Sequence, residues 1–462
     1  MDSYVYWSPL VQIGFLCLAL IIGNTLRRKV PLLNKSLLPS SVIGGILILA
    51  FKLIPDFDAL ISASFMEGIT YHCLALGFIA LTLKEKDPSK KGGMIVVKTG
   101  AVVVSTYIIQ AFIGLTITVL LSLVLTNVLP ASGLLMMLGF GQGPGQALNF
   151  GIAYEDNYGF VGGRTFGLTI ASIGFLVACI VGVIAINIFK RQGKLRDVSN
   201  KEKTYQTVQE VSNPNDIPLS ESVDKFTVNI AIVLITYLAT YGFMFGTSTL
   251  CGYLGNFGVN TVRPLIWGFN FLFGTLFALL AKVIMKWFKK IRFQSRNYTN
   301  NFLLNRISGF VFDLMILAGI SAIEFEHLTG LWLPILLLSI GGTVVTFVYL
   351  GYICKRLYPE YRYEAFASLF GMLTGTASTG TILLREVDPQ FETPASNNLI
   401  MQTVPAIAFG FPILLLVGFA PQSLAHSLIT MAIISVLFVG FNLFILGKRK
   451  KKMTAPLDGE NE

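Results

Sequence analysis

Apolar runs of roughly 17–30 residues recur along almost the whole chain and are separated by short polar loops. A run of this length can cross the hydrocarbon core of a bilayer as one helix. Hydrophobic residues make up 53% of the 462 positions and charged residues only 13%, which argues against a soluble enzyme and excludes a disordered chain. The sequence therefore predicts one all-α polytopic membrane protein.

About eleven runs can be placed. Five precede a polar stretch, at about 9–26, 37–53, 62–83, 94–128 and 160–189. Six follow it, at about 226–250, 264–287, 307–323, 331–354, 398–419 and 424–446.

The order of the runs predicts a domain organisation. Residues 1–189 form a first repeat of five spans, 190–225 a cytoplasmic linker and 226–419 a second repeat of five spans. An extra C-terminal span, 420–447, and a cytoplasmic tail, 448–462, complete the chain. Because an odd number of crossings reverses the entry side of an equivalent second half, we expect inverted repeats.

Lys and Arg are concentrated in the loops that follow every odd-numbered run, beginning with Arg27, Arg28 and Lys29. Basic loops are retained on the cytoplasmic side, so the N-terminus is predicted outside and the C-terminus inside a cell (inner or plasma) membrane. The formal net charge of +10 is explained by these loops, because no basic face or aromatic-interleaved patch typical of nucleic-acid binding is present.

Two segments interrupt this pattern with small residues. The first, 131–153, is apolar on both flanks and broken by Gly139, Gly141, Gly143, Pro144 and Gly145. The second, 364–386, has an apolar arm, the tip Gly375 to Gly380 and a second arm ending in charge. Arms of about ten residues are too short to cross the bilayer. Each segment is therefore predicted to form a re-entrant hairpin before the fifth helix of its repeat.

Unwound tips at membrane depth would offer backbone groups to a ligand. Helix N-termini suit a carboxylate, so the candidate substrate-binding residues are Gln142, Gly143, Gly145, Gln146, Asn149, Thr379, Gly380 and Arg385. Carbonyl and hydroxyl oxygens suit Na⁺, and the candidate metal ligands are Thr374, Thr376, Ser378 and Asp313. The alternative interpretation is that these small residues only let helices pack closely.

These motifs resemble the glutamate:sodium symporter family, with a distant similarity to citrate:sodium symporters. The resemblance spans about Leu10 to Phe419 and includes the Pro-Ser-Ser-Val-Ile-Gly-Gly opening at Pro39 to Gly45 and the tip Gly-Thr-Ala-Ser-Thr-Gly at Gly375 to Gly380. The first tip, Gly139 to Gly145, departs from the Ser-Gly-Gly-His-Gly-Thr-Gly common in the family. The resemblance implies a homodimeric secondary transporter in which a hairpin-bearing unit moves relative to a dimerisation scaffold.

Ionisable residues within apolar runs are functional candidates. Asp313 is interpreted either as a cation ligand or proton carrier, or as a buried carboxylate bonded to Ser or Thr on another helix. Glu67 and His72 lie near the outer end of their run, and Arg164 lies early in its own. Arg385 either binds a substrate carboxylate or is an interfacial arginine that reaches the membrane surface.

We expect a Na⁺-coupled symporter of glutamate or a similar small anionic amino acid, working by alternating access. No Walker-type loop or His-Glu-X-X-His motif is present, so no enzymatic activity is predicted, and Na⁺ is expected as the coupling ion without another cofactor. The expected partners are the small anionic solute, Na⁺, the lipid bilayer and a second copy of the chain. The alternatives are a di- or tricarboxylate (citrate-like) symporter and, from another class, a channel or membrane sensor.

Overall fold

The computed structural model describes residues 4–54, 60–84, 93–195, 219–255, 258, 262–291, 299–389 and 392–447. Within these ranges the regular structure is entirely helical, and ten helices are long and apolar enough to cross a membrane. The prediction of an all-α, multi-pass membrane protein is confirmed.

The long helices contain the ten candidate spans. They are α1 (Tyr4–Lys29), α4 (Ala63–Leu83), α5 (Met94–Ser122), α8 (Gly163–Arg191), α9 (Leu219–Leu250), α12 (Asn270–Lys290), α13 (Asn301–Ser321), α14 (Trp332–Leu357), α18 (Thr403–Phe419) and α19 (Leu424–Leu446). The shorter helices are α2 (Pro31–Ser36), α3 (Ser40–Phe51), α6 (Leu134–Gln142), α7 (Pro144–Tyr158), α11 (Arg263–Gly268), α15 (Arg362–Thr374), α16 (Ala377–Val387) and α17 (Pro394–Met401). Single 3₁₀ turns lie at Pro130–Gly133, Cys251–Leu254, Phe325–Leu328 and Ala420–Gln422.

The second predicted span is shorter than expected. Leu37 ends α2 in the left-handed conformation, and α3 begins only after Pro39. The resulting helix has 12 residues, a length of about 18 Å at the usual rise of about 1.5 Å per residue. This is less than the thickness of the hydrocarbon core, so the apolar run overstated the length of the helix.

Two other expectations concern regions that are only partly described. Helix α9 begins at Leu219, inside the predicted linker 190–225, and α8 continues to Arg191. Residues 196–218 of that linker and the whole predicted tail, 448–462, lie outside the described residues.

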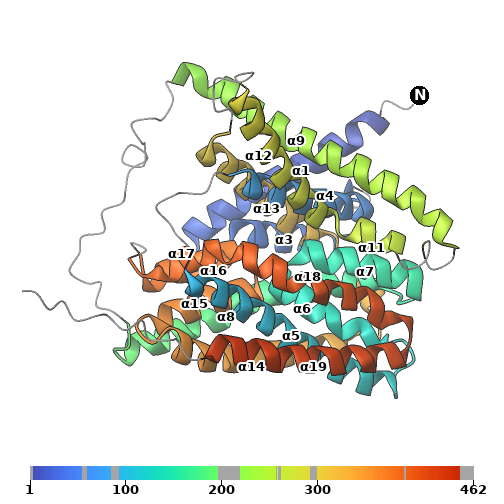
Figure 1. The fold of residues 1–462 in the computed structure, drawn as a ribbon, viewed down its shortest axis with the longest axis vertical. Coiled ribbons are helices and arrows are strands. Elements are labelled where there is room, and N and C mark those ends of the chain that lie inside the picture. The colour runs from blue at the N-terminus through green and yellow to red at the C-terminus, as the bar shows by residue number, and fades with distance from the viewer. Residues whose placement is uncertain are drawn as a thin grey trace, which may run out of the picture.

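The helices form two groups, which Figure 1 shows one above the other. The upper group contains α1, α3, α4, α9, α12 and α13, and its closest pairing is between α4 and α13. The lower group contains α5 to α8, α14 to α16, α18 and α19, with α5 packed against α14, α18 and α19. Segments far apart in sequence therefore share each group.

Helix α7 of the lower group lies against α4, α13 and α11. The contact is close because glycines occur on both sides. A Cβ on Gly145 would lie 3.0 Å from Leu74 of α4, and a Cβ on Gly319 of α13 would lie 2.9 Å from Pro144. The two groups thus approach each other around the first turn of α7.

Helix α19, which coincides with the last predicted apolar run at 424–446, is attached to the lower group by polar contacts. Asn442 Nδ2 donates to Ser105 Oγ of α5 at 3.1 Å, and Tyr349 OH of α14 donates to Asn442 Oδ1 at 3.1 Å. Lys98 Nζ of α5 donates to the carbonyl of Ile445 at 2.8 Å, at the C-terminal end of α19. The outer surface of α19 remains apolar and exposed.

Candidate functional site

The first glycine-rich segment breaks at one residue. Gly143 separates α6 from α7 with φ +86° and ψ −175°, a combination that is essentially restricted to glycine. Pro144 follows as the first residue of α7, where its missing N–H and its fixed φ suit a helix start. Gly139 and Gly141 remain inside α6, so only one of the predicted breaking glycines ends the helix.

The second segment breaks at Gly375 and Thr376, between α15 and α16. Thr376 is extended and precedes the first residue of α16, and its carbonyl accepts from the N–H of Gly380 at 2.9 Å. The side-chain hydroxyls of Thr376 and Thr379 lie 3.4 Å apart. This break lies within the predicted tip.

The two breaks meet. A Cβ on Gly143 would lie 3.5 Å from Thr376 Cγ2 and 3.9 Å from the carbonyl oxygen of Gly375. The C-terminal ends of α6 and α15 and the N-terminal ends of α7 and α16 therefore converge. Each pair of ends carries backbone groups without helical partners, carbonyls at the C-termini and N–H groups at the N-termini.

Two of the candidate substrate-binding amides lie on one side of α7, three residues apart. Gln146 is 1% exposed, and neither its Nε2 nor its Oε1 has a hydrogen-bond partner among the described residues. Asn149 Nδ2 donates to the carbonyl of Gly268 at 2.9 Å, while its Oδ1 has no such partner in the same part of the chain. This side of α7 faces the upper group.

Sequence reasoning missed a third helix break, at Phe269 between α11 and α12. Its freed carbonyls accept side-chain donors, since Tyr71 OH donates to Trp267 at 2.7 Å and Asn149 to Gly268. Asn270 Nδ2 in turn donates to the carbonyl of Tyr71 at 3.0 Å. The break was hidden within the apolar run 264–287, and Gly268 was the one local signal for it.

Two predicted glycines have packing roles in the structure. Gly145 faces Leu74, as described above. A Cβ on Gly380 would lie 2.5 Å from the carbonyl oxygen of Ser368, so its small size lets α16 pack against α15. The close-packing interpretation accounts for both contacts.

The candidate Na⁺ ligands differ in orientation. Thr374 Oγ1 donates to the carbonyl of Phe370 within its own helix at 2.7 Å, whereas Ser378 is exposed. Asp313 Oδ1 accepts from Ser41 Oγ of α3 at 2.9 Å, inside the upper group. This is the hydrogen bond of the second interpretation of Asp313, and no hydrogen bond joins Asp313 to Thr374, Thr376 or Ser378 in the described structure.

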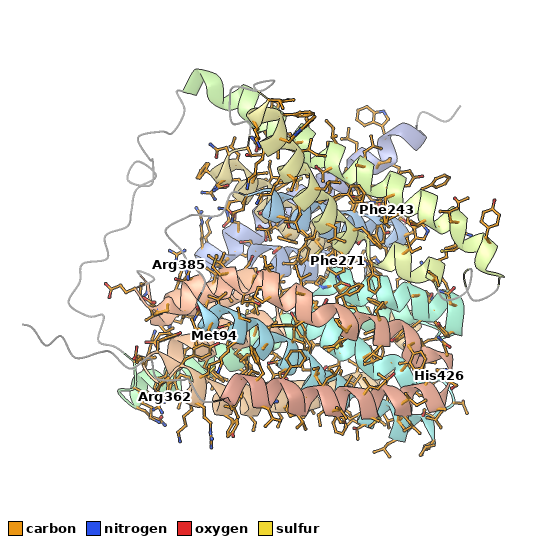
Figure 2. The ribbon with its side chains drawn as sticks, in the orientation of Figure 1. Met94, Phe243, Phe271, Arg362, Arg385 and His426 are labelled. Atoms are coloured by element: carbon orange, nitrogen blue, oxygen red, sulfur yellow. The ribbon has the colours of Figure 1, made fainter. Side chains whose placement is uncertain are left out.

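The remaining candidates lie at the ends of their helices. Gln142 is the last residue of α6 and is half-buried. Arg385 lies in the last turn of α16 and is exposed. Figure 2 shows Arg385 and Arg362 at the same end of the molecule and His426 at the opposite end.

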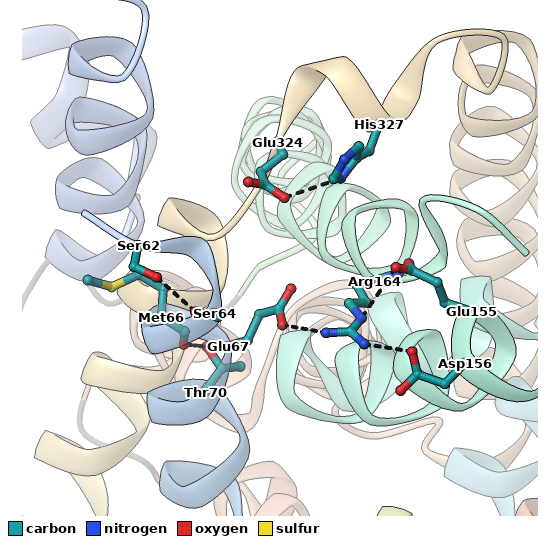
Figure 3. Close-up of polar contacts among 10 residues, drawn as sticks. All are labelled: Ser62, Ser64, Met66, Glu67, Thr70, Glu155, Asp156, Arg164, Glu324 and His327. Atoms are coloured by element: carbon teal, nitrogen blue, oxygen red, sulfur yellow. Dashed lines mark hydrogen bonds and ion pairs between the residues drawn. The ribbon is translucent and has the colours of Figure 1, made fainter. Parts of the chain in front are cut away.

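Arg164 is the centre of a charge cluster that joins the two groups (Figure 3). Its guanidinium lies 2.7 Å from Asp156 and 3.4 Å from Glu155, both of α7, and 3.1 Å from Glu67 of α4. The Glu67 side chain is 12% exposed. The ion pair between Arg164 and Glu67 is thus a polar link between the lower and upper groups.

His72, the other ionisable candidate in α4, has a different partner. Its Nδ1 lies 2.7 Å from the hydroxyl of Tyr237 on α9. This hydrogen bond joins two helices of the upper group and does not involve the charge cluster.

The family comparison agrees with the resemblance found in the sequence. Residues 9–366 match the model of the sodium/glutamate symporter family. The match includes the first break and stops within α15, so it does not extend to the second break. No curated relative matches the chain. Because the match covers well over half of the sequence, the chain belongs to the sodium/glutamate symporter family, a family of membrane transporters and not of enzymes.

Proposed function

We propose that this protein couples Na⁺ entry to the uptake of glutamate or a similar small anionic amino acid. Family membership supports a sodium-coupled transporter. The observation that carries the proposal is the meeting of Gly143 with Thr376, which brings four helix ends together. Gln146 supports it further, because its buried amide has no hydrogen-bond partner among the described residues, which is costly unless a ligand completes its hydrogen bonds.

The electrostatics of the helix ends favour binding of both ions. The N-termini of α7 and α16 stabilise a carboxylate through free N–H groups and the positive end of the helix dipole. The C-termini of α6 and α15 stabilise a cation for the opposite reason. Because the two kinds of end adjoin, binding of Na⁺ would raise the affinity for the anion, and linkage requires the reverse effect to be equal.

We infer that transport occurs by alternating access between inverted repeats. The breaks then belong to re-entrant hairpins, as suggested by the short helices α6, α7, α15 and α16 and by the position of Arg362 and Arg385 at one end of the molecule. The lower group carries both hairpins and would move relative to the upper group. A homodimer formed through the upper group, with the N-terminus outside and the C-terminus cytoplasmic, completes this proposal.

Uptake by purified protein in liposomes tests the function. Labelled glutamate or aspartate should accumulate only under an inward Na⁺ gradient, because the breaks offer neutral oxygens and no row of titratable carboxylates. Labelled citrate serves as the comparison. Accumulation of citrate alone would favour the di- or tricarboxylate alternative, and full accumulation driven by a pH gradient in Na⁺-free buffer would contradict Na⁺ coupling.

Arg385 lies in the last turn of α16, at the end of that helix away from the break at Thr376. If Arg385 reaches the substrate carboxylate during transport, Arg385→Gln should raise the KM for the acidic substrate by about tenfold or more, because a charge-assisted hydrogen bond contributes about 1.5–3 kcal/mol. Initial rates are measured against substrate at saturating Na⁺. Arg356→Gln is the control, since Arg356 is an exposed arginine in the last turn of α14. Equal KM values for Arg385→Gln and wild type would identify Arg385 as an interfacial residue.

A further inference from the structure

A buried glutamine on α5 reaches both helix breaks. Gln110 is 0% exposed, and its Nε2 donates to the carbonyl of Leu373 at 2.9 Å, in the last turn of α15. Nε2 also donates to Thr346 Oγ1 of α14 at 2.8 Å. On its other side, Gln110 Oε1 lies 3.3 Å from the position of a Cβ on Gly141, in the last turn of α6.

These contacts determine the orientation of the amide. The carbonyl of Leu373 can only accept a hydrogen bond, so the NH₂ group of Gln110 must face it and Oε1 must point away. In the part of the chain that the structure describes, Oε1 has no hydrogen-bond partner. Leaving a buried carbonyl oxygen without a partner costs free energy, so a role that compensates this cost is expected.

The surroundings of Oε1 favour a cation. Helices α6 and α15 both end beside Gln110, at Gln142 and Thr374, and contribute the negative ends of their dipoles. The Tyr107 ring packs against Gly141, where a Cβ would clash with its Cε1. The Tyr107 hydroxyl donates to the Gly141 carbonyl at 3.1 Å and so orients this oxygen beside Oε1. Neutral amide and carbonyl oxygens are suitable ligands for a hard cation.

We propose that Gln110 Oε1 is a ligand of the coupling Na⁺, at the point where α6 and α15 end. The proposal deepens the proposed function and depends on its Na⁺ coupling, but not on the identity of the substrate. It places an α5 side chain in a site that sequence reasoning assigned to the second hairpin and Asp313. The Na⁺ would then hold the two breaks together through one buried amide.

The test measures thermal unfolding of the full-length protein in detergent, with NaCl titrated against choline chloride and no substrate present. Na⁺ alone should raise the Tm of the wild type. Gln110→Met keeps the length of the side chain and removes its oxygen, so the Na⁺ concentration giving half of the Tm shift should rise at least tenfold. Thr346→Val removes one acceptor of the Gln110 amide and leaves Oε1 in place, so it should stay within twofold of wild type.

A purely structural role for Gln110 predicts a different result. Gln110→Met would then lower the Tm equally in both salts and leave the Na⁺ dependence unchanged, which would overturn the proposal, as would the absence of a Na⁺ shift in the wild type. If Gln110→Met does not fold, Gln110→Leu is measured instead, because it also removes the side-chain oxygen. An unchanged Na⁺ dependence in the folded Gln110→Leu variant overturns the proposal. If Gln110→Met loses the Na⁺-dependent Tm shift but the wild type takes up no glutamate, the result would support the Na⁺ site and contradict glutamate as the substrate.

Discussion

Gly143→Ala should abolish Na⁺-driven uptake while the protein still inserts into the membrane. The backbone at Gly143, with φ +86° and ψ −175°, costs a residue with a Cβ about 1–3 kcal/mol. The added methyl group would also contact Thr376 at the place where the two breaks meet. The measurement is initial uptake in liposomes containing equal amounts of monodisperse variant and wild type.

Gly159→Ala is the matched control for this experiment. Gly159 ends α7 with φ +68°, is exposed and has open space where a Cβ would be. It therefore carries backbone strain without a nearby second break, and uptake should remain within about twofold of wild type. Near-normal uptake by Gly143→Ala would mean that the conformation at Gly143 is not required for transport.

Arg164→Gln should lower the free energy of unfolding by about 1–3 kcal/mol, between the ranges for exposed and for buried pairs, because the cluster is partly exposed. The substitution leaves Glu67, Glu155 and Asp156 facing one another without their common cation. Glu67→Gln should have less than half of this effect, since Arg164 keeps its two carboxylates on α7. Thermal unfolding in detergent measures the loss of stability. Uptake in liposomes shows whether transport also depends on the ion pair between the two groups.

Lys190→Gln provides the comparison for the charge cluster. Lys190 lies 3.8 Å from Glu386, both side chains are exposed, and both belong to the lower group. Exposed pairs contribute about 0–1 kcal/mol, so the Tm should hardly change. A drop in Tm equal to that of Arg164→Gln would indicate a general effect of removing positive charge and would refute a specific role for the cluster.

Long, uniform apolar runs predicted their helices well. Helix α19 has the expected bounds, Leu424–Leu446, and α4 begins one residue after its predicted start. Hydrophobicity alone determines where such helices lie in a bilayer. Hydropathy did not predict helix boundaries that are set by the backbone within an apolar run. Helix α3 begins only after Pro39, and a turn at Phe269 separates α11 from α12.

The site was predictable in outline and not in detail. Glycine content located both breaks, but it could not distinguish Gly143, which ends a helix, from Gly139 and Gly141, which remain inside one. The contacts of Arg164 with Glu67 and of Gln110 with Leu373 join residues far apart in sequence. Such pairs depend on how the groups pack together, and no local pattern in one sequence reveals them.

The attachment of α19 to α5 and α14 has a consequence for the surrounding lipid. If the lower group moves as a unit, the hydrogen bonds of Asn442 require α19 to move with it. Its exposed residues, among them Val436, Val439 and Leu443, would then shift against the acyl chains in every cycle. Each movement would change the hydrophobic mismatch between this apolar face and the bilayer, which costs free energy. The thickness and fluidity of the membrane would therefore contribute to the energy barrier to transport.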